Sequence, residues 1–162
     1  MKILFIQTGG TIDKDYPKSI GGYAFEITSP AFLRILEKAN PGFDFEYECL
    51  FRKDSLEIDD TDREKLLILC QNTPHRNIII THGTDTMIQT GRYLKEIHNK
   101  TIIITGSMKP ERFKDTDASF NLGMAVGAII HAVPGVHIAI QGTVSPIDSI
   151  MRDPQSGTFL TK

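Results

Sequence analysis

Residues 77–87 read NIIITHGTDTM, and this stretch decides the fold class. The β-branched run Ile78–Ile80 is followed by a glycine loop and then by a helical pattern that begins near Thr86. Short, continuously apolar runs are typical of strands that are covered on both faces of a parallel sheet. The stretch therefore predicts one strand–loop–helix unit of an α/β fold, with polar side chains in the loop.

The same alternation extends along the whole chain. Four further runs are predicted as strands, namely Ile3–Ile6, Phe43–Leu50, Ile102–Ile104 and Val136–Ile140. Strands that alternate with helices through short links build a parallel sheet with helices packed against it. We expect a doubly wound, flavodoxin-like α/β domain over residues 1–152, a three-layer αβα sandwich with helices on both faces of the sheet.

Local signals predict four helix starts, which are Ser29-Pro30, Thr61, Thr86 and Asp117. Ser29 and Asp117 are expected to cap a helix with their side chains, and Thr61 and Thr86 are each expected to open a capping box. The helix after Asp117 is expected to carry Phe120 among its recurring apolar residues.

Composition excludes several classes of protein. The 162 residues are 40% hydrophobic and 23% charged, as in ordinary globular domains. A formal net charge of −2 and scattered basic residues predict no nucleic-acid partner. The N-terminal apolar run is too short for a signal peptide and no stretch is long enough to span a bilayer, so we expect a cytoplasmic protein without membrane contact.

The cysteines and histidines predict neither a metal site nor another cofactor. Cys49 and Cys70 lie in apolar runs without metal-ligand spacing, and we expect two reduced thiols in the core, the alternative being a single disulfide. The five histidines also show no ligand spacing with acids or thiols.

Three predicted strands end in loops of similar composition. The loops are Thr8–Ile12, Thr81–Thr86 and Thr105–Pro110, and each combines glycine with hydroxyl or charged side chains. Ligands of open parallel sheets bind beyond the carboxyl ends of the strands. We expect the three loops to share one rim and to form an active site there.

Within these loops, Thr84, Asp85 and Lys109 provide a hydroxyl, a carboxylate and an amine. A threonine nucleophile needs a base because its hydroxyl is hardly ionised near neutral pH, and a lysine with a lowered pKa can act as that base. The three side chains are expected to form either a relay beside Thr11 or an independent acid–base group.

The same loops also have a purely structural interpretation. The structural alternatives are a tight turn at Gly9-Gly10, a helix cap at Thr84, a helix-dipole partner at Asp85 and a solvated loop lysine at Lys109. The convergence of these residues on one rim favours the functional interpretation. In that interpretation, the main-chain N–H groups of Gly10 and Gly83 are free to stabilise an oxyanion.

At these residues the sequence resembles the L-asparaginase/glutaminase family of bacterial type. Thr8–Ile12 is similar to the first signature of that family, His82–Met87 to its second, and Thr105–Pro110 to the segment that carries its lysine. The similarity extends along the whole chain. It implies an amidohydrolase that releases ammonia from the side-chain amide of asparagine or of a related small amide.

The resemblance also implies catalytic roles. Thr11 would attack the amide carbon as the nucleophile, and Tyr23 would assist it from the long loop between residues 12 and 28. Thr84, Asp85 and Lys109 would form the second catalytic group. The alternative for Tyr23 is an exposed loop aromatic beside a glycine pair.

A second set of residues is implied to bind the substrate. Ser55 would bind its α-carboxylate and Asp85 its α-amino group, with Gly10, Gly83 and Thr84 beside them. The alternative for Ser55 is a turn residue without contact to substrate.

The end of the chain departs from the family pattern. Family members continue into a smaller C-terminal domain, and residues 153–162 resemble the linker to it. In the family, that domain of a neighbouring subunit completes the amino-group pocket. For this chain, the alternatives are a weakly active or inactive module that binds aspartate or asparagine, and a subunit that needs a partner chain. The surface that would face the second domain is expected to be apolar, which predicts a homo-oligomer.

Overall fold

The central sheet of the described residues contains five parallel strands, and each corresponds to one predicted run. The computed structural model describes residues 1–16 and 25–162. The strands are β1 (Lys2–Gly9), β4 (Asp44–Lys53), β5 (Asn77–Thr81), β6 (Thr101–Thr105) and β7 (Gly135–Ile140). They lie in the order β4-β1-β5-β6-β7, which is the flavodoxin-like order, so the predicted fold class is confirmed. An additional strand, β8 (Thr143–Pro146), pairs antiparallel with β7 at the edge.

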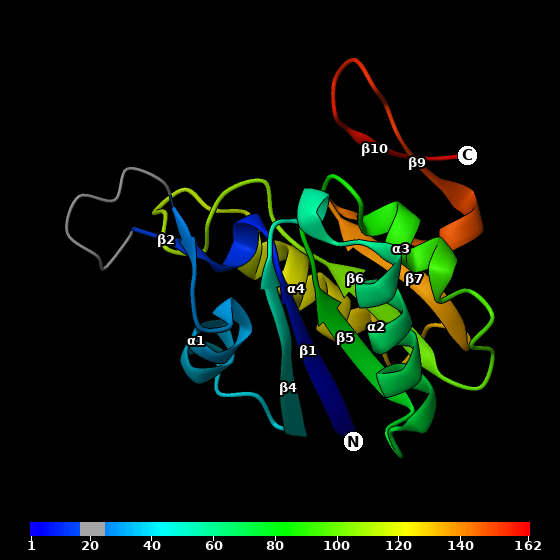
Figure 1. The fold of residues 1–162 in the computed structure, drawn as a ribbon. Coiled ribbons are helices and arrows are strands. Elements are labelled where there is room, and N and C mark those ends of the chain that lie inside the picture. The colour runs from blue at the N-terminus through cyan, green and yellow to red at the C-terminus, as the bar shows by residue number, and fades with distance from the viewer. Residues whose placement is uncertain (17–24) are drawn as a thin grey trace.

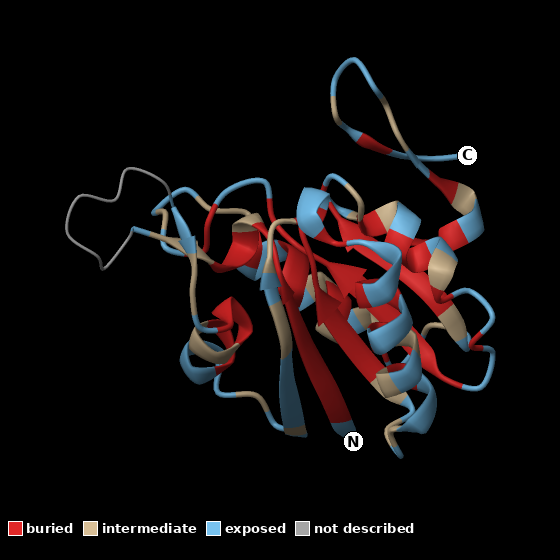
Figure 2. Cartoon of the chain, viewed as in Figure 1, coloured by how far each residue is buried: buried red, intermediate tan, exposed pale blue. Residues whose placement is uncertain are grey.

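Helices cover both faces of this sheet (Figure 1). The helices α1 (Ala31–Ala39) and α4 (Ala118–Ala128) pack on the face that presents Phe5, and α2 (Asp60–Asn72) and α3 (Met87–Tyr93) on the face that presents Ile6. Successive side chains of a strand point to opposite faces, so β1 contributes to two separate cores. Figure 2 shows both layers of buried residues between the helices and the sheet.

Several short strands and helical turns connect or follow these elements. The strands β2 (Lys14–Asp15) and β3 (Glu26–Ile27) pair antiparallel, as do β9 (Ile150–Arg152) and β10 (Phe159–Thr161). Among the described residues, three single-turn 3-10 helices lie at Thr11–Asp13, Ser55–Glu57 and Ile147–Ser149. The β9–β10 hairpin includes part of the expected linker, and Figure 1 shows it on the side toward which the parallel strands run.

The predicted capping residues do not form the hydrogen bonds that the sequence predicts. The N-cap of α2 is Asp59, two residues before the predicted Thr61, and Asp59 and Asp62 form the capping box. Thr86 stands at the N-cap position of α3, but its hydroxyl donates to the carbonyl oxygen of Ser55 at 2.7 Å. At Thr86, a partner that is distant in the sequence thus replaces the expected local bond.

Two other caps are also supplied differently. The backbone N–H of Ala31, at the start of α1, donates to Asp13 Oδ1 at 2.7 Å, whereas Ser29 makes no cap bond. Asp117 precedes α4, but its carboxylate accepts from the backbone N–H groups of Met108 and Lys109.

Two predictions about the core were also wrong. Phe120 is 63% exposed, because α4 turns the small residues Ala118 and Ala125 toward the sheet and so packs closely against it. Cys49 is exposed because β4 is the edge strand, while Cys70 is buried, and both thiols are free.

Candidate active site

Three segments meet in direct contact at the carboxyl ends of β1 and β5. We call Gly10, Gly83 and Ser55 the glycine junction. A Cβ atom added to Gly10 would lie under 3.0 Å from the Cα and N atoms of Gly83, and one added to Gly83 would lie 2.6 Å from Ser55 Oγ. Gly10 also has a φ of +85°, which side-chain-bearing residues rarely adopt. The backbone approach at this point therefore requires glycine.

The glycine junction lies where the strand order reverses. In the sheet, β1 is flanked by β4 and β5, and crevices of this kind hold the ligands of doubly wound folds. Hydrogen bonds fix the segments around it. Thr8 Oγ1 donates to the carbonyl oxygen of Thr81 at 2.9 Å, and Lys14 Nζ pairs with Asp54 Oδ2, just before Ser55, at 2.8 Å.

One of the two expected oxyanion donors is already engaged. The N–H of Gly10 donates to the carbonyl oxygen of Lys53 at 3.0 Å, since the β1–β4 pairing continues to this position. The expectation that it is free was wrong. In the described part of the chain, the N–H of Gly83 has no such acceptor, and it remains a candidate donor.

Thr11 directly follows the glycine junction and begins the 3-10 helix Thr11–Asp13. Its side chain is half-buried, whereas Asp13 is fully buried. Asp13 Oδ2 accepts from Gln7 Nε2 at 3.0 Å, and Oδ1 holds the start of α1. Burial raises the pKa of Asp13 to about 7, despite these hydrogen bonds and the positive charge of Arg34 nearby. The position of Thr11 thus depends on a buried carboxyl group that no local sequence signal indicated.

His82 is fully buried beneath Gly83. Its Nδ1 lies 2.8 Å from the carbonyl oxygen of Gly83, and its Nε2 lies 2.9 Å from Thr90 Oγ1. Because a carbonyl oxygen only accepts, Nδ1 carries the hydrogen, and Nε2 accepts from the Thr90 hydroxyl. Arg63 Nε in turn donates to Thr90 Oγ1 at 3.3 Å. Burial lowers the pKa of His82 to about 4, so a neutral ring orients the peptide group that follows Gly83.

Beyond the glycine junction lies a set of charged residues that we call the charged rim, namely Asp85, Lys109 and Arg152. Arg152 Nη1 donates to Asp85 Oδ1 at 2.7 Å and to the carbonyl oxygen of Thr84 at 3.4 Å. Thr84 itself is buried, and Asp85 is exposed. Arg152 comes from β9, and the sequence analysis did not single it out.

Lys109 has a firmly held backbone and a half-exposed side chain. The carboxylate of Asp117 accepts from the N–H of Lys109 at 3.1 Å, and Asn121 Nδ2 donates to the carbonyl oxygen of Gly106 at 3.0 Å. The ammonium group of Lys109 pairs with Asp115. In the described residues, Asp85 and Lys109 therefore each have another partner, and their action as one group stays a prediction.

Comparison with known proteins assigns the family. Residues 2–152 match the family described as Asparaginase, N-terminal. The chain belongs to the asparaginase family. An L-asparaginase from Thermococcus kodakarensis is 29% identical over 150 residues, which cover 89% of this chain and 45% of that protein. A glutaminase-asparaginase from Acinetobacter glutaminasificans is 36% identical over 74 residues, which cover 41% of this chain and 22% of that protein.

Solved asparaginase structures share the fold. The thermostable L-asparaginase from Thermococcus kodakarensis superimposes with a TM-score of 0.84 at 27% identity, covering 99% of this chain and 51% of that one. A probable cytoplasmic L-asparaginase from Campylobacter jejuni superimposes with a TM-score of 0.80 at 23% identity, with 99% and 52% covered. The chain thus spans about half the length of the asparaginases it matches.

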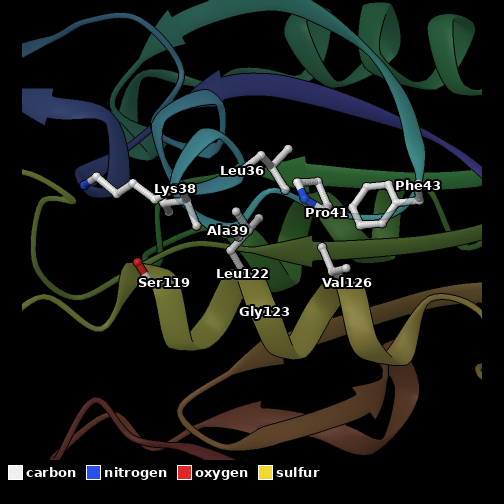
Figure 3. A pocket seen from close by; sticks show the side chains of 10 residues that line it. Leu36, Lys38, Ala39, Pro41, Phe43, Ser119, Leu122, Gly123 and Val126 are labelled. Atoms are coloured by element: carbon white, nitrogen blue, oxygen red, sulfur yellow. The ribbon is translucent and has the colours of Figure 1, made fainter.

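Several other features bear on the sequence predictions but are not part of this site. Tyr23 belongs to residues 17–24, which lie outside the described part of the chain. Among the described residues, no cluster of histidine, cysteine and acidic side chains is placed to hold a metal ion, and no helix is long and apolar enough to cross a membrane. An apolar hollow of about 330 Å³ lies between α1 and α4, and none of the predicted site residues of the asparaginase family lines it (Figure 3).

Proposed function

We propose that this chain is an asparaginase-like amidohydrolase with Thr11 as its nucleophile. Thr11 Oγ1 forms a bond to the side-chain amide carbon of asparagine or a related small amide, and the C–N bond breaks with release of ammonia. Water then attacks the resulting ester, which yields the acid and frees the Thr11 hydroxyl. The supporting observation is the glycine junction, which brings the segment of Thr11 against those of Ser55 and Thr84 within a chain of the asparaginase family.

The surrounding groups have distinct tasks in this proposal. The N–H of Gly83 stabilises the oxyanion, and Ser55 binds the carboxylate of the substrate. Thr84, Asp85 and Lys109 move the protons that the two steps require. Lys109 acts as a base only when it leaves Asp115, which an exposed ion pair permits at little cost.

Ammonia release tests the proposal directly. Purified protein is incubated with asparagine, glutamine and succinamate, and ammonia is measured. We expect release from at least one amide, and a loss of at least about 10³-fold in Thr11→Ala because the nucleophile is gone. Thr61→Ala, an exposed threonine of α2, is the matched control and should retain the wild-type rate. Equal rates for Thr11→Ala and wild type would refute the nucleophile.

A second candidate is a module that binds aspartate or asparagine without turnover. The observation that favours a loss of turnover is the ion pair of Lys109 with Asp115, which keeps this amine from acting as a base. Calorimetry separates the two functions, since saturable binding without ammonia release supports the module.

Homo-oligomerisation and a cytoplasmic location stay predictions. Exposed apolar side chains such as Leu56 and Phe120 would favour association. Sedimentation of a monomer at high concentration would contradict the oligomer.

A further inference from the structure

We propose that Arg152 determines which substrates the site accepts, by pairing with Asp85, the carboxylate that the family resemblance implies as the partner of an α-ammonium group. The site then takes small amides and dicarboxylates without an α-ammonium group, such as succinamate and succinate, in preference to asparagine and L-aspartate. The preference for succinamate over asparagine as a substrate rests on the proposed function. The preference for succinate over L-aspartate concerns binding alone and requires no turnover.

The acidic side chains at this edge of the sheet are paired. An ammonium group that leaves water needs a carboxylate in return. Within the described residues, the carboxylates that follow the strand ends are each engaged. The pairs are Asp54 with Lys14, Asp85 with Arg152, Asp115 with Lys109, and Asp117 with the backbone of residues 108 and 109. An incoming ammonium group must therefore compete with donors that are already bound and, at Asp85, approach the positive charge of Arg152.

Arg152 is held in place by several contacts. Its Nη1 donates to Asp85 and to the carbonyl oxygen of Thr84, and its Nε donates to the carbonyl oxygen of Gly157 at 3.1 Å. The guanidinium group also lies 5.5 Å above the ring of Phe159, which is buried. Three acceptors, at Nη1 and Nε, and an aromatic face hold the planar group, so its displacement costs more than that of a free surface arginine.

The opposite side of the site keeps its hydrogen-bond donors. Ser55 Oγ lies against Gly83, whose N–H is free of protein acceptors among the described residues. Hydroxyl and N–H groups bind carboxylate and amide oxygens. One end of a four-carbon substrate is therefore recognised, while its α-carbon faces a guanidinium group that repels positive charge.

Calorimetry with succinate and L-aspartate tests the inference, since the two differ only in the ammonium group. Wild type should bind succinate about fivefold more tightly, the scale of a partly exposed ion pair. Arg152→Gln frees Asp85 and should shift the ratio toward L-aspartate. Arg152→Lys keeps the charge and should keep the wild-type order.

A matched control removes an equivalent ion pair. Arg112 Nε lies 3.0 Å from Asp15 Oδ2, and Arg112→Gln makes the same chemical change away from Asp85. It should leave the binding ratio unchanged. Circular dichroism and a thermal melt establish that each variant is folded.

The outcomes separate this inference from the proposed function. Equal or tighter binding of L-aspartate by wild type, no binding of either ligand, or an unchanged ratio in Arg152→Gln would overturn it. Ammonia release that prefers asparagine over succinamate would overturn it and leave the amidohydrolase intact. Preferential succinate binding without Thr11-dependent ammonia release would support it and overturn the amidohydrolase.

Discussion

The glycine junction and the charged rim lie next to each other but are held by different forces. At the junction, atoms of Gly10 and Gly83 are so close that one added carbon would overlap with backbone. At the rim, half-exposed side chains such as Lys109 and Arg152 are held by ion pairs. Overlap cannot be relieved by small rotations, whereas an exposed ion pair such as that of Lys109 with Asp115 exchanges partners readily. In the proposed function, the junction therefore fixes the position of Thr11, and the rim affects which substrate binds.

The largest effect is expected at the junction. Gly10→Ala places a Cβ atom against Gly83 at a φ that favours glycine, so the free energy of unfolding should fall by at least about 4 kcal/mol. Urea denaturation measures it. Gly123→Ala is the control, because a Cβ atom there meets nothing within 4 Å in an exposed stretch of α4, and it should stabilise by about 0.5–1 kcal/mol. Similar stabilities of the two variants would contradict the packing argument.

The next largest effect concerns Asp13, behind the junction. Burial raises its pKa from 3.8 to about 7, so the folded state holds this proton more tightly than the unfolded chain. The resulting stabilisation is complete below about pH 4 and is lost as the pH rises through about 7. Asp13→Asn does not titrate, and its stability relative to wild type should increase by on the order of 4 kcal/mol from pH 4 to pH 8. Urea denaturation across this range checks it, and a constant difference would contradict it.

His82 should show the opposite dependence on pH. Burial lowers its pKa from 6.5 to about 4, so its contribution to stability is lost as the pH falls from about 6.5 through 4. In His82→Gln this loss is absent, and the stability of the variant relative to wild type should rise by on the order of 3 kcal/mol from pH 7 to pH 4. Denaturation curves at both pH values measure it. Parallel pH profiles of variant and wild type would show that the ring is not held neutral.

The smallest effect on stability, but a large one on activity, is expected at the rim. Lys109→Gln should leave the melting temperature unchanged, because its ion pair is exposed, and should lower ammonia release by at least about 10²-fold if Lys109 moves protons. Lys114→Gln, an exposed lysine of the same loop, should affect neither. An active Lys109→Gln variant would remove Lys109 from the mechanism.

The sequence predicted the features that depend on local pattern. Continuous apolar runs such as Ile78–Ile80 predicted the strands of the parallel sheet, and their alternation with helices predicted the layers. The same logic placed the loops of Gly10 and Gly83 at one edge, where the structure brings them into contact. These features follow from periodicity and topology, which the sequence displays directly.

Features that depend on distant partners escaped the sequence analysis. Thr86 has the local signature of a capping residue, but its hydroxyl bonds to Ser55, 31 residues away. Asp13 and Arg152 have no local signature, because each acquires its role from a contact with another part of the fold. Which charges pair at the rim likewise depends on side-chain positions that spacing does not determine.

The central claim is that Thr11 forms an ester with the substrate, and trapping with hydroxylamine tests it most directly. Hydroxylamine attacks such an ester, frees the threonine and yields a hydroxamate of the substrate. With succinamate or asparagine, wild type should form this hydroxamate and Thr11→Ala should form none. Hydroxamate formation by Thr11→Ala at the wild-type rate, or ammonia release by wild type without any hydroxamate, would contradict the claim.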